Sequence, residues 1–214
     1  MSNITPEDTE NIRLVLSHAR LSTYDTAVLP TGKSALELYI WNGHVSAALF
    51  IPLQICEVII RNSVSDALEI IYGHSWPWNK TFETSLPNAR MQELLKAREN
   101  KTALGQVIPE LSFFFWQSMF TNRHFGRIWS QHIDRLFPNM EPGMAKQAKR
   151  IHIHNELEHI RTLRNRIAHH EPIFKRDLER DYQRIVDLVE LRNSASAQWL
   201  AQNNFFGTIY RLKP

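Results

Sequence analysis

Apolar residues recur every three to four positions along most of this chain, the spacing that gathers them on one face of an α-helix. No two alternating segments flank a tight turn, so nothing in the pattern indicates a β-hairpin. The pattern therefore predicts an all-α fold, a bundle of mostly antiparallel helices joined by short connections. The predicted helices cover residues 6–19, 22–25, 34–40, 45–71, 88–99, 109–120, 123–137, 144–170 and 173–200.

The longest apolar stretch, Val45–Ile60, predicts the central core helix of the bundle. A transmembrane helix needs about 18 or more nearly uninterrupted apolar residues, whereas this stretch is shorter and contains Glu57. Asn42 and Gly43 interrupt the preceding helical pattern, so we expect a separate short helix before them. Pro52 is expected to kink the core helix.

Aromatic residues are concentrated in two segments. Residues 113–120 are apolar on nearly every side of a helix, which predicts that this segment is buried or forms an interface. The loop at 74–87 contains Trp76, Trp78 and Phe82. Exposed rings of this kind can stack on RNA bases, but they more often close the end of a bundle, and we favour the second interpretation.

A length of 214 residues suits a single domain. We assign residues 33–202 to its core, 1–32 to an N-terminal helical extension and 203–214 to a tail. The net charge of +3 and the pI near 9.1 are compatible with nucleic-acid binding and do not require it. The single Cys56 excludes an internal disulfide, and the first residues lack a signal-peptide pattern. We therefore expect a cytoplasmic protein without a membrane segment.

The segment Leu163–Pro172, with the sequence Leu-Arg-Asn-Arg-Ile-Ala-His-His-Glu-Pro, combines cations and imidazoles at the expected end of a helix. Asn165 and His169 are four positions apart and share a face, and Arg166 and His170 repeat this spacing. An imidazole can act as a general base near neutral pH, and a guanidinium binds phosphate oxygens. Such a pair can support RNA cleavage by the substrate's own 2′-hydroxyl, although spacing alone favours a solvated basic helix end.

A second group of charged residues lies in the predicted core helix. Glu57 and Arg61 are four positions apart, in the order that favours an ion pair, so one interpretation is a structural pair. The other is that Arg61 and Asn62 reach the same cleft as Arg164, and the residues expected to bind substrate are then Arg61, Asn62, Arg166 and Glu57. The sequence leaves both interpretations open.

Other chemistries have little support in the sequence. The chain has ten histidines, but it has no His-Glu-x-x-His motif and no cysteine cluster, so we predict no metal site. It also lacks a Walker loop, a glycine-rich dinucleotide motif and a Gly-x-Ser-x-Gly elbow, so we predict no cofactor. Cys56 lies in the most apolar stretch and is expected in the core.

An ordered set of short motifs resembles a known family. The string Arg164–Ile173 is similar to the Arg–His signature of the HEPN superfamily, and in particular to its Abi-like (AbiD/AbiF-type abortive-infection) branch. The chain departs from that branch at Phe114, where the family usually has glycine. The resemblance covers approximately residues 35–200, and its other matches are Tyr39-x-Trp41-Asn42, Glu57-Val58-x-Ile60-Arg61-Asn62, Leu111-Ser112-Phe113-Phe114-Phe115-Trp116 and Trp129.

The resemblance implies a HEPN-like helical bundle that acts as a metal-independent endoribonuclease, either in phage defence or as the toxin of a toxin–antitoxin pair. It implies that His169 is the general base and that Arg164 stabilises the charged phosphate. Asn165 would orient His169 or the phosphate, and His170 would protonate the leaving oxygen. The implied partners are RNA and, for a toxin, an antitoxin protein.

A homodimer is expected on two grounds. The aromatic segment at 113–120 offers more apolar surface than one bundle easily buries, and proteins of the resembled family commonly pair. A symmetric pairing would bring two copies of the Arg–His motif to one cleft. The alternative function is a non-catalytic helical dimer that binds RNA or protein and retains the motif as scaffold.

Overall fold

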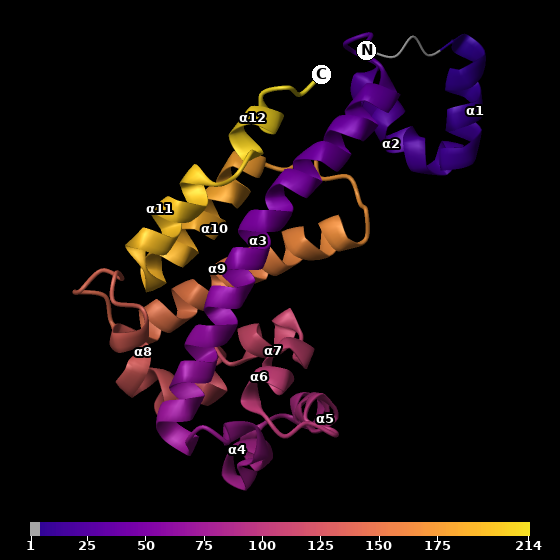
Figure 1. Cartoon of the computed structure of the whole chain (residues 1–214). Coiled ribbons are helices and arrows are strands. Elements are labelled where there is room, and N and C mark those ends of the chain that lie inside the picture. Colours follow the sequence, from indigo (N-terminus) through magenta and orange to yellow (C-terminus); the bar gives the residue numbers. More distant parts are fainter. Residues whose placement is uncertain (1–4) are drawn as a thin grey trace.

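The computed structural model describes residues 5–214, and every regular element in that range is a helix (Figure 1). This confirms the predicted all-α class. The first four residues, on which the expectation of no signal peptide partly rests, lie outside the described range. The elements are α1 (Pro6–Leu16), α2 (His18–Val28), α3 (Ala35–Tyr72), η1 (Trp76–Trp78), α4 (Lys80–Ser85), α5 (Asn88–Ala97), α6 (Leu104–Val107), η2 (Ile108–Glu110), α7 (Phe113–Ser118), η3 (Asn122–His124), η4 (Phe125–Trp129), α8 (Ser130–Leu136), α9 (Lys146–Ala168), α10 (Leu178–Arg192), α11 (Ser194–Gln202) and α12 (Phe206–Tyr210).

Helix α3 runs along the length of the molecule and forms its axis (Figure 1). The predicted break at Asn42 and Gly43 is wrong, because the helix continues through both residues and through Pro52. The side chain of Asn42 bonds to a distant loop, so it does not compete for the helix's own backbone groups. The helix ends where predicted, at Gly73, whose φ of 80° lies in the left-handed region that glycine adopts readily.

One face of α3 packs against α2, α9, α10 and α12, and it includes the fully buried Cys56, as predicted. By length and composition alone α3 is also apolar enough to cross a membrane. Its packing against α7 and α8 as well as these four helices, and the charged Glu57 and Arg61 within it, agree with a core helix. The buried apolar side chains that recur along this face are Leu38, Val45, Leu49, Leu53, Ile60, Val64 and Leu68.

The aromatic loop closes one end of the bundle, which confirms the interpretation favoured from sequence. Trp76 and Phe82 are fully buried, and the Trp76 ring contacts Trp116 edge-on at a centroid distance of 6.2 Å. The aromatic segment at 113–120 forms only the short α7, and all its aromatic side chains except Phe114 are buried within this one chain. This segment therefore does not supply the large unburied surface from which we expected a dimer.

The C-terminal third differs from prediction, because its helix begins at Leu178 and not at 173 and is divided in two. The helix expected over 173–200 is two helices, because the extended backbone of Asn193 ends α10 and its side chain caps α11 through the backbone N–H of Ser196. The tail forms α12, which packs on α3. The indole nitrogen of Trp41 donates to the carbonyl of Ile209 at 2.9 Å and fixes this contact.

The N-terminal extension forms a helical hairpin. Its second helix starts at His18, earlier than predicted, because Ser17 adopts a φ of 70° and caps the new helix. Arg13 and Asp25 join α1 to α2 with an ion pair at 2.8 Å. Tyr24 on α2 is buried against α3, so this helix contributes to the core, whereas α1 has no buried residue.

Candidate functional site

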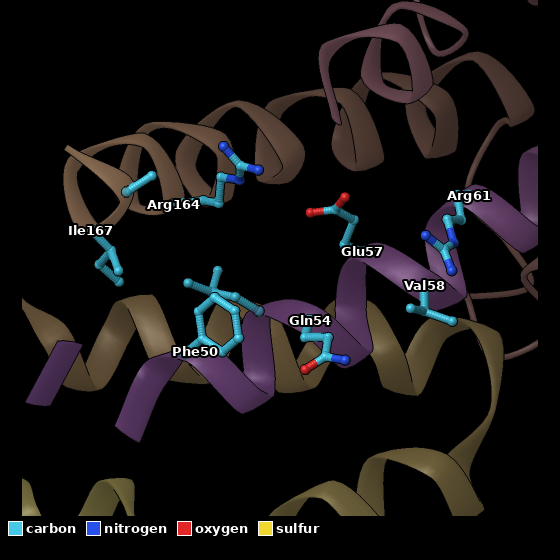
Figure 2. A pocket seen from close by; sticks show the side chains of 9 residues that line it. Phe50, Gln54, Glu57, Val58, Arg61, Arg164 and Ile167 are labelled. Carbon is cyan, nitrogen blue, oxygen red and sulfur yellow. The ribbon is translucent and has the colours of Figure 1, made fainter. Parts of the chain in front are cut away.

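A cleft between α3 and the C-terminal end of α9 contains charged residues that the sequence singled out (Figure 2). We call it the arginine cleft, because Arg61 enters it from α3 and Arg164 from α9. Its volume is about 410 Å³. Its lining residues are Phe50, Leu53, Gln54, Glu57, Val58, Arg61, Arg164, Ile167 and Ala168.

Glu57 and Arg61 do not form the structural ion pair that was one of the two interpretations. Both are half-buried, and no ion pair joins them in the described part of the chain. A half-exposed pair at this helical spacing gains less than about 1 kcal/mol, which is too little to hold both side chains together. Instead, the Glu57 carboxylate points from α3 toward the helix that carries Arg164 (Figure 2).

The guanidinium of Arg61 has unused hydrogen-bonding capacity. Its Nε is buried and has no hydrogen-bond partner among residues 5–214. The two terminal guanidinium nitrogens, which are not buried, also have no hydrogen-bond partner in the described chain, so they can donate to an anion in the cleft. Because Arg61 and Arg164 both line this cavity, they share one cleft, as the second interpretation expected.

Helix α9 ends inside the Arg–His motif. His169 is its C-cap residue, and His170 follows with a φ of 55°, a conformation that residues other than glycine rarely adopt. The backbone N–H groups of His170 and Glu171 donate to the carbonyls of Ile167 and Arg166 at 3.0 and 2.8 Å, which is the double closure of a Schellman turn. Both histidine side chains are exposed beyond the last helical turn.

Two arginines brace this turn from its own helix and from α2. Arg20 on α2 donates to the backbone carbonyl of His170. Arg166 donates to the carbonyl of Pro172 at 3.0 Å and lies 3.5 Å from the carboxylate of Glu171. Arg166, which we expected to bind substrate, thus makes structural contacts in the turn.

Asn42 anchors the chain immediately after the turn. Its side-chain oxygen accepts hydrogen bonds from the backbone nitrogens of Ile173 and Phe174, at 2.8 and 3.2 Å, and the residue is only 6% exposed. These bonds fix the turn relative to α3. Sequence reasoning missed the roles of Asn42 and Arg20, because partners more than 100 positions apart leave no local spacing signal.

Some residues expected at the site lie outside the arginine cleft. Asn62 is exposed in a separate groove on α3, because one step along a helix rotates the side chain by about 100°. His169 does not line the cleft either, although Ala168 beside it does. Asn165 is half-buried, and its carbonyl accepts the backbone N–H of His169 at 2.9 Å.

Chemically, the arrangement suits an anion near an exposed imidazole. Two guanidinium groups and one carboxylate leave a net charge of +1 in the cleft, and the two histidines follow the lining residue Ala168 in the chain. Within residues 5–214, no cluster of three or more His, Cys, Asp or Glu side chains is arranged to hold a metal ion. What the protein's own side chains offer at this site is electrostatic stabilisation of an anion and proton transfer by imidazole.

Comparisons of this chain with protein-family models, with curated proteins and with solved structures return no significant match. The resemblance described from the ordered motifs therefore stays a prediction. The function has to be inferred from the residues of the site itself.

Proposed function

We propose that this protein is a metal-independent endoribonuclease of the abortive-infection or toxin–antitoxin type. The observation that supports this best is that Arg61 and Arg164, from two helices, line one cleft. The last lining residue, Ala168, directly precedes His169 in the sequence. A phosphate bound in this cleft would accept hydrogen bonds from the guanidinium groups of Arg61 and Arg164. The exposed histidines at the rim would then lie next to the ribose of the bound nucleotide.

In the proposed reaction, His169 accepts the proton of the ribose 2′-hydroxyl, and the resulting oxygen attacks the adjacent phosphorus. Arg164 and Arg61 bind the non-bridging oxygens and stabilise the charge that develops on them. Asn165 orients His169, and His170 donates a proton to the departing 5′-oxygen. The products are a 2′,3′-cyclic phosphate and a 5′-hydroxyl, so neither water nor a metal ion is consumed in the cleavage step.

The strained turn gives the proposal a physical basis. A left-handed conformation at a non-glycine residue is unfavourable and persists only where surrounding contacts impose it. Arg20, Arg166 and Asn42 supply such contacts around His170. The molecule therefore fixes the backbone of two exposed histidines at a helix end, in a turn where glycine would be the ordinary residue.

We also propose that two copies pair across the exposed stripe of α3. Ile40, Phe50 and Ile51 are apolar and between 43% and 59% exposed, and Phe50 lines the arginine cleft. A two-fold pairing along this stripe would bring two Arg–His motifs together without additional sequence. The proposed location is the cytoplasm, where RNA is accessible, and an antitoxin protein is a further proposed partner.

The test is to incubate the purified protein with total RNA in EDTA and to map the new ends. We expect 5′-hydroxyl and cyclic-phosphate ends, which His169→Ala abolishes. His152→Ala, an exposed histidine elsewhere on α9, is the matched control and should retain cleavage. If the wild-type protein binds RNA and leaves it intact, the non-catalytic RNA-binding alternative is correct.

A further inference from the structure

A second pocket adjoins the arginine cleft. Phe50, Ile167 and Ala168 line both cavities, so the two are neighbours along α3. The second pocket has a volume of about 660 Å³ and also reaches Tyr24 and Tyr39. We call it the tyrosine pocket.

Two residues of the tyrosine pocket are buried, but each has a polar atom that lacks a protein partner in the described chain and is not itself buried. Asn42 and Tyr24 both line it and are 6% and 1% exposed. Over the described range, neither the Asn42 Nδ2 nor the Tyr24 hydroxyl takes part in a hydrogen bond, whereas the Asn42 oxygen accepts two. Because backbone N–H groups can pair only with that oxygen, the orientation of the amide is fixed, and its NH₂ group is a preorganised donor.

The second group, the Tyr24 hydroxyl, also carries a proton at neutral pH, and burial makes it still harder to ionise. Desolvation raises the pKa of Tyr24 to about 12, with Tyr39 acting in the same direction and Arg20 opposing it. The hydroxyl of Tyr24 is therefore protonated at neutral pH. The fixed NH₂ group of Asn42 and the Tyr24 hydroxyl, which can also donate, favour a ligand with acceptor atoms, since an apolar ligand would leave both unsatisfied.

The remaining surfaces of the pocket are aromatic or apolar. The rings of Tyr24 and Tyr39 pack edge-on at a centroid distance of 5.2 Å, and Phe50 is 59% exposed between the two cavities. The guanidinium of Arg20, which also lines the pocket, donates to the turn at His170. A planar heteroaromatic ring with carbonyl or ring-nitrogen acceptors fits this combination of stacking faces and donors.

We propose that the tyrosine pocket binds one unstacked nucleobase of the RNA strand whose phosphate occupies the arginine cleft. The inference rests on the proposed function, because the phosphate proposed for the arginine cleft determines which base of the RNA strand lies at the tyrosine pocket. It goes beyond that function by defining the substrate as single-stranded RNA. A base inside a duplex cannot enter the pocket without first leaving the stack.

Gly43 offers a way to fill the pocket without disturbing the fold. It lines the pocket and lies within α3, and a Cβ atom added at this position would meet no other atom within 4 Å. Gly43→Leu should therefore occupy the cavity and, if anything, favour the helix. Gly105→Leu in α6 is the matched control, because Gly105 is equally open and does not line the pocket.

Binding is measured by calorimetry with two kinds of probe. One is the set of four ribonucleoside monophosphates, and the other is a set of 2′-O-methyl oligonucleotides, which lack the attacking hydroxyl and cannot be cleaved by the proposed route. We expect Gly43→Leu to weaken oligonucleotide binding at least tenfold and Gly105→Leu to leave it unchanged. Tyr24→Phe, which removes only the hydroxyl, should weaken binding by about 2- to 10-fold.

The outcomes separate the pocket from the proposed reaction. Equal oligonucleotide binding by Gly43→Leu and wild type overturns the pocket proposal even if RNA is cleaved in EDTA. Loss of oligonucleotide binding in a Gly43→Leu protein that sediments like the wild type supports the pocket even if no cleavage occurs, and only the proposed function then fails. Mononucleotide binding without oligonucleotide binding also overturns the proposal, because the ligand would then be a free nucleotide.

Discussion

The side-chain oxygen of Asn42 accepts a hydrogen bond from the backbone nitrogen of Ile173, 131 positions later in the chain, at 2.8 Å. This bond attaches the turn that carries the histidines to the central helix. Asn42→Ala leaves two buried backbone N–H groups without an acceptor and should lower the free energy of unfolding by about 1–3 kcal/mol.

Urea denaturation measures this effect, and Asn62→Ala is the control. Asn62 lies on the same helix but is exposed, so its loss should change stability by no more than about 0.5 kcal/mol. Equal effects of the two substitutions would show that the anchor at Asn42 contributes nothing beyond local helix propensity.

His170 is expected to show a conflict between stability and activity. Its φ of 55° suits glycine, so His170→Gly should stabilise the protein by about 0.5–1 kcal/mol. The same substitution removes the proposed proton donor and should slow RNA cleavage. Thermal unfolding and cleavage rates measured on one preparation test both effects, and a destabilised His170→Gly would mean that the imidazole itself supports the turn.

Three features could be predicted because each depends on local periodicity and burial. They are the helical class, the core role of α3 and the closure of one bundle end by the aromatic segment at 74–87. The α9 boundary was also predicted within two residues, since Pro172 disfavours helix before it. The breaks were harder to predict. Asn42 resembles a helix breaker in sequence, but its partner is a distant loop, whereas Asn193 does end a helix by capping the next one.

The candidate site was predictable only in part, because it too depends on contacts between residues that are far apart in the sequence. The convergence of Arg61 with Arg164 was one of two open interpretations, and a spacing of four residues could not decide between them. Asn62 was wrongly expected in the same cleft, because adjacent residues on a helix point in different directions. The contribution of Arg20 depends on how α2 packs, which no local motif encodes.

His124 should make stability fall in mild acid. The residue is 1% exposed, and burial, with Arg127 and Arg123 adding to it, lowers its pKa from 6.5 to about 4. Below pH 6.5 the unfolded chain binds a proton that the folded chain does not, so stability is present above pH 6.5 and is lost as pH falls toward 4. The effect is on the order of 3 kcal/mol.

The comparison of wild type with His124→Gln isolates this contribution. Glutamine does not titrate, so the stability difference between the two proteins should change between pH 6.5 and 4 by the amount attributed to His124. Chemical denaturation at several pH values gives this difference directly. Parallel curves over the whole range would mean that His124 titrates normally and is accessible to water.

The dimer proposal makes a prediction about the exposed stripe of α3. Ile51 is 43% exposed and lies outside the arginine cleft, whereas Ile70 is 41% exposed near the opposite end of the helix. Sedimentation of the wild-type protein should give about twice the 25.1 kDa chain mass. Ile51→Lys places a charge in the proposed apolar contact and should give a monomer, whereas Ile70→Lys should leave the dimer intact.

If the composite site is correct, RNA cleavage falls with Ile51→Lys although its arginine cleft and histidines are unchanged. A wild-type monomer that cleaves RNA would exclude pairing as a requirement for the reaction.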